Sequence, residues 1–149
     1  MGNTNHRGSS LQSEGVTPER KQLVENLKKL KNKIENDPDG IVLKYIILGA
    51  HNCGKSLLTI RFLTDKFVTE LPSTAGIDFY QQGIKSNKER IKLQIFDTGS
   101  YDLYREVIIN YLPSMDGVIL CYDVTDLQSF ELTSQILQDI RLYIPDPKV

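Results

Sequence analysis

Two glycines, a lysine and a serine occur at a fixed spacing in the stretch GAHNCGKS, residues 49–56. Gly49 and Gly54 leave the backbone free to curl, so that several N–H groups can point at one cluster of phosphate oxygens. Lys55 can then reach the terminal phosphates, and the hydroxyl of Ser56 can coordinate Mg²⁺. Because the stretch lies between an apolar run and a helical pattern, it predicts a phosphate-binding loop. The alternative is a Gly-rich turn that binds nothing.

Three residues inside this loop need a separate interpretation. Asparagine tolerates left-handed backbone angles almost as well as glycine, so Asn52 fits a tight loop. Cys53 is small, and the loop needs only its backbone. His51 is the unusual residue. It could lie over the terminal phosphate or point to solvent, and we expect it to point to solvent.

A carboxylate follows another apolar segment, in KLQIFDT, which ends at residues 97 and 98. In α/β folds the carboxyl end of a strand is where a carboxylate linked to Mg²⁺ belongs, and Asp97 takes that place. The alternative for Asp97 is a structural role, as the cap of the next turn.

Alternating strand and helix patterns provide the frame for these residues. Residues 41–48 form an almost unbroken apolar run, which is typical of a buried parallel strand. The remaining patterns predict strands over 77–84, 90–96 and 116–122 and helices over 55–66 and 127–144. This alternation predicts an α/β domain with a mostly parallel sheet and flanking helices.

The region before residue 40 has a different composition. Residues 1–16 are polar and rich in Gly, Ser and Asn, which predicts a disordered tail. Residues 17–38 predict an amphipathic helix, because their apolar residues recur at helical spacing on one face. We expect that helix to pack on its own domain or on a partner; the alternative is a basic helix on a membrane surface. Gly2 is suited to N-myristoylation, but His6 stands where that motif has Ser or Thr, so acylation is not expected.

The overall composition excludes several classes of protein. The chain is 40% apolar and 25% charged, with a formal net charge of −1, so nucleic acid is not an expected partner. Cys53 and Cys121 are too few for a disulfide framework or a zinc site, and we expect reduced thiols of a cytoplasmic protein. The apolar runs are far shorter than the roughly 18 residues that span a bilayer.

Four segments of the chain resemble those of the Ras-like small GTPases, and within them the Rab branch: GAHNCGKS, STAGIDF, KLQIFDT and CYDVTDLQSFE. They occur in the family's order and at about its spacings, over about residues 43–149. The resemblance implies a P-loop NTPase fold, GTP or GDP as ligand and Mg²⁺ as cofactor. It implies three metal ligands, which are Ser56, Thr74 and, through water, Asp97. The nucleotide-binding residues that it implies are Gly49, Asn52, Cys53, Gly54, Lys55, Ser56, Leu57, Thr74 and Ser100.

The resemblance also implies partners. Two switch segments, around 66–78 and 97–112, would order on the triphosphate and relax after hydrolysis. Effector, exchange-factor and GTPase-activating proteins would bind through them, and effectors also at the strand start over 76–79. The implied function is a nucleotide-dependent switch in vesicle trafficking, in the cytoplasm or peripherally on endomembranes.

The second switch departs from the family's pattern. Gly99 lies one place earlier than the family's glycine, so Ser100 takes the position whose N–H meets the γ-phosphate. Tyr101 takes the position of the glutamine that orients the attacking water. A phenol cannot both donate to and accept from that water in one geometry, and His51 stands where a small residue helps to admit an arginine finger. We therefore expect slow GTP hydrolysis and assign no catalytic residue.

The chain ends at YIPDPKV, before the family's guanine-reading segment and its prenylated cysteines, so residues 41–149 are expected to be a partial G domain. Strand 116–122 would then be an apolar sheet edge, covered by the helix over 17–38 or by a partner; the simpler explanation is a fragment of a longer protein. Three functions remain open: a Rab-like GTP-binding switch, a degenerate or truncated GTPase-fold interaction module with weak or no nucleotide binding, and a P-loop ATPase.

Overall fold

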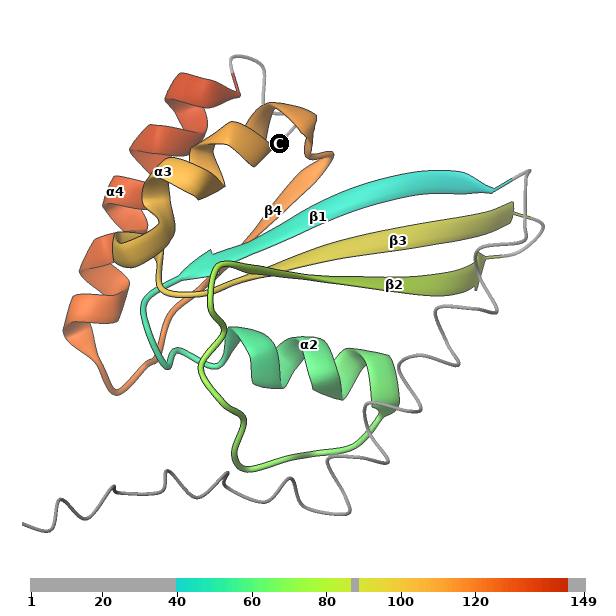
Figure 1. The fold of residues 1–149 in the computed structure, drawn as a ribbon, viewed down its shortest axis with the longest axis horizontal. Helices are drawn as coiled ribbons and strands as arrows, with labels where there is room; N and C mark the ends of the chain where they lie inside the picture. Colours follow the sequence, from blue (N-terminus) through green and yellow to red (C-terminus); the bar gives the residue numbers. More distant parts are fainter. Residues whose placement is uncertain (1–39, 87–88, 145–149) are drawn as a thin grey trace, which may run out of the picture.

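A computed structural model describes residues 40–86 and 89–144. The predicted tail over 1–16 and the predicted helix over 17–38 lie outside these residues. Four strands form one sheet in the order β2-β3-β1-β4 (Figure 1). Their bounds are β1 Ile41–Gly49, β2 Ile77–Ser86, β3 Glu89–Thr98 and β4 Gly117–Cys121. β1 pairs in parallel with β3 and β4, and β2 pairs antiparallel with β3, which confirms the predicted mostly parallel sheet.

Helices cover both faces of this sheet. α2 (Lys55–Thr64) lies against one face, and α3 (Tyr101–Tyr111) and α4 (Leu127–Tyr143) lie against the other (Figure 1). A short 3-10 turn, Leu112–Ser114, follows α3. The α3/α4 face holds the larger apolar core, and the α2 face holds a smaller one. This arrangement confirms the predicted fold class for the described residues.

The helix α3 was not predicted, because we interpreted residues 97–112 only as a switch segment. Its pattern is nevertheless readable. Tyr101, Tyr104, Ile108 and Leu112 are spaced 3, 4 and 4 residues apart, and Tyr101, Ile108 and Leu112 are fully buried. The other elements predicted within residues 41–144 are present, with ends that differ by a few residues.

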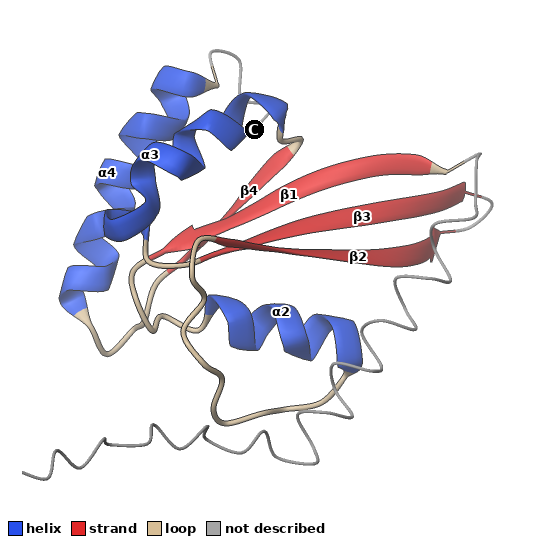
Figure 2. Cartoon of the chain, viewed as in Figure 1, coloured by secondary structure: helices blue, strands red, loops and turns tan. Residues whose placement is uncertain are grey.

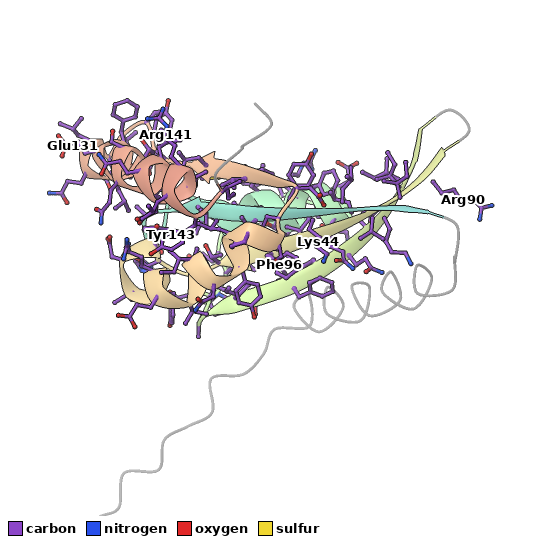
Figure 3. The ribbon with its side chains drawn as sticks, turned by 90° about the horizontal axis from the view of Figure 1, so that it is seen from above. Lys44, Arg90, Phe96, Glu131, Arg141 and Tyr143 are labelled. Atoms are coloured by element: carbon purple, nitrogen blue, oxygen red, sulfur yellow. The ribbon has the colours of Figure 1, made fainter. Side chains whose placement is uncertain are left out.

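The loops that follow β1, β3 and β4 gather at one end of the sheet (Figure 2). The carboxyl ends of the parallel strands lie at this end, which is where α/β folds bind ligands. The end of β2 and the start of β3, which pair with each other, lie at the opposite end of the sheet, which Arg90 marks in Figure 3. The topology therefore places the predicted phosphate loop and Asp97 side by side.

Among the described strands, β4 lies at the edge of the sheet next to β1. The side chains of Ile119 and Tyr122, on and just after this strand, are 39% and 46% exposed. Edge strands present unpaired backbone groups on their outer side. None of the described helices is long and apolar enough to cross a membrane.

Candidate functional site

The loop between β1 and α2 has the backbone that the sequence predicted. Asn52 adopts a left-handed conformation with φ of 57°, and Gly54 has φ of 90°. A Cβ atom at Gly49 would lie 2.8 Å from the Cys53 sulfur and closer still to the Cys121 carbonyl, so no larger residue fits there. Gly54 caps α2 without a side-chain hydrogen bond, which leaves the first N–H groups of α2 available to an anion.

Lys55 is held inside this loop. Its side chain is only 6% exposed, and its ammonium donates hydrogen bonds to the carbonyls of Ala50 (2.6 Å) and Gly49 (3.2 Å). The Cys53 sulfur lies 3.9 Å from the same ammonium. Carbonyl oxygens are weaker acceptors for a cation than charged phosphate oxygens. The ammonium is thus positioned at the loop by contacts that a phosphate group can replace.

Two hydroxyl groups from distant parts of the chain meet next to Lys55. The Oγ of Ser56 and the Oγ1 of Thr74 are 2.8 Å apart and share a hydrogen bond. Ser56 lies in the first turn of α2, whereas Thr74 belongs to the irregular segment before β2. The structure therefore brings together the two hydroxyl ligands that the resemblance implied for one metal ion.

Asp97 is a buried carboxylate near this pair. It has no exposed surface, and neither of its oxygens accepts a hydrogen bond from any described residue. Burial raises the pKa of the Asp97 carboxyl to about 6, with a smaller contribution from Asp78. The Ser56 hydroxyl, which lies near the carboxylate but outside hydrogen-bond geometry, and the Lys55 ammonium lower this pKa. An unpaired buried carboxylate is costly in a folded protein unless a cation or a donor binds it.

Lys55, Ser56 and Thr74 line a cavity of about 470 Å³. The segment of residues 69–74 forms one wall, and the loop and the start of α2 form another. Gly99 and Ser100 close the cavity from the side of α3. The residues of the predicted nucleotide set that line it are Asn52, Gly54, Lys55, Ser56, Leu57, Thr74 and Ser100. Gly49, Cys53 and Asp97 do not line the cavity, and His51 lines it with an exposed side chain.

Gly99 is explained by a close approach of the two switch segments. Its N–H donates to the Gly76 carbonyl at 2.8 Å. A Cβ atom at Gly99 would lie 2.5 Å from the Thr74 carbonyl and 2.6 Å from the Tyr104 ring. Ser100 has ordinary backbone angles, with φ of −59° and ψ of 130°, so a serine is accommodated at this position without strain. The early glycine therefore allows the first switch segment to pack against the start of α3.

Tyr101 lies elsewhere than the sequence suggested. We expected its phenol at the position of a water-orienting glutamine, but the side chain is fully buried in the core and does not line the cavity. Its hydroxyl donates to the Asp139 carboxylate at 2.5 Å. A buried ring gains apolar contacts, and its hydroxyl needs a partner, which α4 provides.

Sequence reasoning missed that partner. Asp139 is 6% exposed and also forms a bidentate ion pair with Arg105. Its Oδ2 accepts from the Arg105 Nε at 2.6 Å, and its Oδ1 accepts from Nη2. Arg105 above all, and then the Tyr101 hydroxyl, hold the pKa of the Asp139 carboxyl below its usual value against the effect of burial. No local pattern identifies this aspartate, because its partners lie 34 and 38 residues earlier in the chain.

The oxygen atoms in and beside the cavity are suitable ligands for a magnesium ion. Mg²⁺ prefers oxygen ligands, keeps several waters and is usually bound through one or two protein groups together with substrate phosphates. Ser56, Thr74 and Asp97 supply oxygens of this kind. The described residues contain no cluster of three or more His, Cys, Asp or Glu side chains that could hold a metal ion without such a ligand.

Comparison with known proteins gives consistent matches. A family model described as Ras family matches residues 44–149. Over 106 residues the chain is 37% identical to the Ras-related protein Rab-4 of Dictyostelium discoideum, which covers 70% of this chain and 52% of that protein. It is 38% identical to the Ras-related protein SEC4 of Candida albicans, over 67% of this chain and 48% of that protein. It is 35% identical to the GTP-binding protein YPTM2 of Zea mays, over 70% and 52%. The chain thus spans about half the length of these relatives.

Proposed function

Since the chain belongs to the Ras family of small GTPases, in its Rab branch, we propose that it binds GTP and GDP with Mg²⁺ and acts as a nucleotide-dependent switch in vesicle trafficking. Residues 41–149 would act as the G domain. Guanine as the base follows from the family and from a relative that is named a GTP-binding protein. The described residues would bind the phosphates and the magnesium ion of the nucleotide.

One observation carries this proposal: the buried Asp97 carboxylate without a described hydrogen-bond partner lies near the Ser56–Thr74 hydroxyl pair beside a loop that holds Lys55. A fold that bound no cation would gain stability by replacing such a carboxylate with an apolar side chain. Ser56, Thr74 and Asp97 come from α2, the segment before β2 and the end of β3. Their convergence supports a metal and phosphate site better than a role in packing.

Each group has a distinct proposed task. Lys55 and the first N–H groups of α2 hold the phosphate oxygens, and the Ser100 N–H faces the terminal phosphate. Ser56 and Thr74 would hold the ion directly, and Asp97 through water. The ion, when bound, neutralises charge on the phosphates. Because Thr74 belongs to a segment that forms a wall of the cavity, loss of the terminal phosphate would release that wall.

Slow hydrolysis is the second part of the proposal. Tyr101 is held in the core by Asp139, so its hydroxyl cannot orient a water molecule in the cavity. Even a small GTPase with the glutamine hydrolyses GTP at only about 10⁻⁴ s⁻¹ without an activating protein. We expect this chain to be no faster.

An aromatic surface supports binding of effector, exchange-factor and GTPase-activating proteins at the switches. Phe79 of β2, Phe96 of β3 and Tyr111 of α3 form a continuous row, with ring centroids 5.2 and 5.8 Å apart. Phe96 is labelled in Figure 3, on the α3 side of the sheet. Phe79 and Tyr111 are 45% and 39% exposed. Aromatic side chains in such a position are typical anchors of protein interfaces.

A titration tests the proposal. Fluorescent GTP and ATP analogues, with and without Mg²⁺, are added to the full chain, to Lys55→Ala and to a control, Arg141→Ala, whose exposed arginine on α4 lies outside the cavity lining and both switch segments. We expect Mg²⁺-dependent binding that prefers GTP, that Lys55→Ala weakens at least tenfold and that Arg141→Ala leaves unchanged. Absence of binding by either nucleotide would contradict the proposal and favour an interaction module without nucleotide. Preference for ATP would favour an ATPase.

A further inference from the structure

The beginning of α3 is fixed by three side chains on one side of the helix. Tyr101 and Arg105, four residues apart, both contact Asp139 of α4. The ring of Tyr104, between them in sequence, packs beside Gly99. We call Tyr101, Arg105 and Asp139 the Asp139 cluster. It joins the second switch segment to the neighbouring helix, which lies beside α3 in Figure 1.

The Asp139 cluster satisfies the buried carboxylate on both oxygens. Oδ2 accepts from the Tyr101 hydroxyl and the Arg105 Nε, and Oδ1 accepts from Nη2. Hydrogen bonds with an ionised partner are about twice as strong as neutral ones, and a two-pronged arginine contact also fixes direction. Breaking the cluster would leave the largely buried Asp139 charge without partners, so detachment of α3 from α4 is disfavoured.

The apolar core continues this attachment along α3. Tyr101, Ile108 and Leu112 pack with Ile136 and Ile140 of α4 in one buried cluster. These residues and the Asp139 cluster lie outside the cavity lining. A ligand changes a conformational equilibrium only by as much as its contacts differ between the two states. A nucleotide in the cavity makes no direct contact with the residues that attach α3 to α4.

We propose that the Asp139 cluster keeps α3 folded on α4 whether the nucleotide is a diphosphate, a triphosphate or absent, so that the first switch segment carries the nucleotide-dependent change. The independence from nucleotide state rests on the proposed function, whereas the attachment of α3 to α4 does not. Partners that bind α3 would then recognise a surface that is present in both nucleotide states. Discrimination between the states would come from residues 66–76, including Thr74.

Hydrogen exchange followed by mass spectrometry tests this proposal on the full chain. It is measured without nucleotide, with GDP and with GTPγS, each with Mg²⁺. We expect exchange in peptides from 101–111 to agree within twofold across the three conditions. Peptides from 66–76 should exchange at least tenfold more slowly with GTPγS than with GDP.

Variants then test the cluster itself in the nucleotide-free protein. Asp139→Asn should raise exchange in 101–111 at least tenfold, while Glu106→Gln, which removes an exposed carboxylate of α3, should change it less than twofold. If Asp139→Asn raises exchange throughout the molecule, Tyr101→Phe becomes the deciding variant, because it removes only one hydroxyl of the cluster. It should raise exchange in 101–111 about threefold or more and leave the exchange of β1 unchanged.

Two results would overturn the proposal. One is exchange in 101–111 that is tenfold or more faster with GDP than with GTPγS in the unsubstituted chain. The other is unchanged exchange in 101–111 for both Asp139→Asn and Tyr101→Phe. Failure of nucleotide to bind at all would overturn the proposed function through the titration above, while the nucleotide-free variants would still decide whether the cluster holds α3.

Discussion

The Tyr101 hydroxyl and the Asp139 carboxylate, 38 residues apart in the chain, share a hydrogen bond of 2.5 Å between α3 and α4. This contact holds the Tyr101 side chain, which takes the expected water-orienting position in the sequence, in the core and outside the cavity. The slow hydrolysis that we propose would then have a steric cause in addition to the chemical difference between a phenol and an amide. The same contact holds α3, which begins directly after Ser100, against α4.

Restoring glutamine at this position should therefore fail to restore hydrolysis. Tyr101→Gln would place an amide in an apolar core and remove a buried ring, which lowers the free energy of unfolding by about 3 kcal/mol. Single-turnover GTP hydrolysis should rise less than threefold over the unsubstituted chain. Tyr101→Phe is the control, because it keeps the ring in the core. A tenfold increase in hydrolysis with unchanged stability would show that position 101 can reach the cavity.

The Asp139 cluster should make stability depend on acid pH. The pKa of Asp139 is lowered in the folded state, so at about pH 4 the unfolded chain binds a proton that the folded chain does not. The stabilisation is therefore present above pH 4 and is lost as pH falls through the folded pKa. Urea unfolding from pH 2.5 to pH 7 should show that the advantage of the unsubstituted chain over Asp139→Asn shrinks in acid. A difference that is constant with pH would contradict this assignment.

The sequence predicted the parts of the site that depend on local backbone chemistry. The left-handed Asn52, the placement of Lys55 and Ser56 after a buried strand and the position of Asp97 at a strand end all follow from short-range pattern. The orientation of Tyr101 could not be predicted in this way, because it depends on Asp139, which has no distinctive neighbours in sequence. The helix α3 was missed for another reason: the switch assignment obscured a readable helical spacing.

Gly99 should be needed for the approach of the two switch segments. In Gly99→Ala the new methyl group would meet the Thr74 carbonyl and the Tyr104 ring, and such overpacking costs about 1–3 kcal/mol. Because Thr74 is displaced, the affinity for GTPγS with Mg²⁺ should fall at least tenfold, and the affinity for GDP should fall less. Gly83→Ala, at an exposed glycine of β2 without positive φ, is the matched control. Equal affinities in Gly99→Ala and Gly83→Ala would contradict the proposed contact.

Asp97 should reduce stability when no cation is bound. Replacing it with alanine removes an unpaired buried carboxylate, so Asp97→Ala should be more stable than the unsubstituted chain in EDTA, by about 1 kcal/mol. The added stability that GTPγS and Mg²⁺ give to the unsubstituted chain should be nearly absent from Asp97→Ala. Thermal unfolding under both conditions measures the two effects. A variant that is less stable in EDTA and is stabilised normally by the nucleotide would assign Asp97 a purely structural role.

The metal position tests the account most directly. Crystals of the chain grown with GTPγS and Mn²⁺ in place of Mg²⁺ would show the ion by its anomalous scattering. We expect one peak at the phosphate loop, within about 2.5 Å of the Ser56 and Thr74 hydroxyl oxygens and farther from Asp97, with a water between them. A bound nucleotide whose ion lies away from both hydroxyls, or the absence of nucleotide from the cavity, would contradict the proposed site.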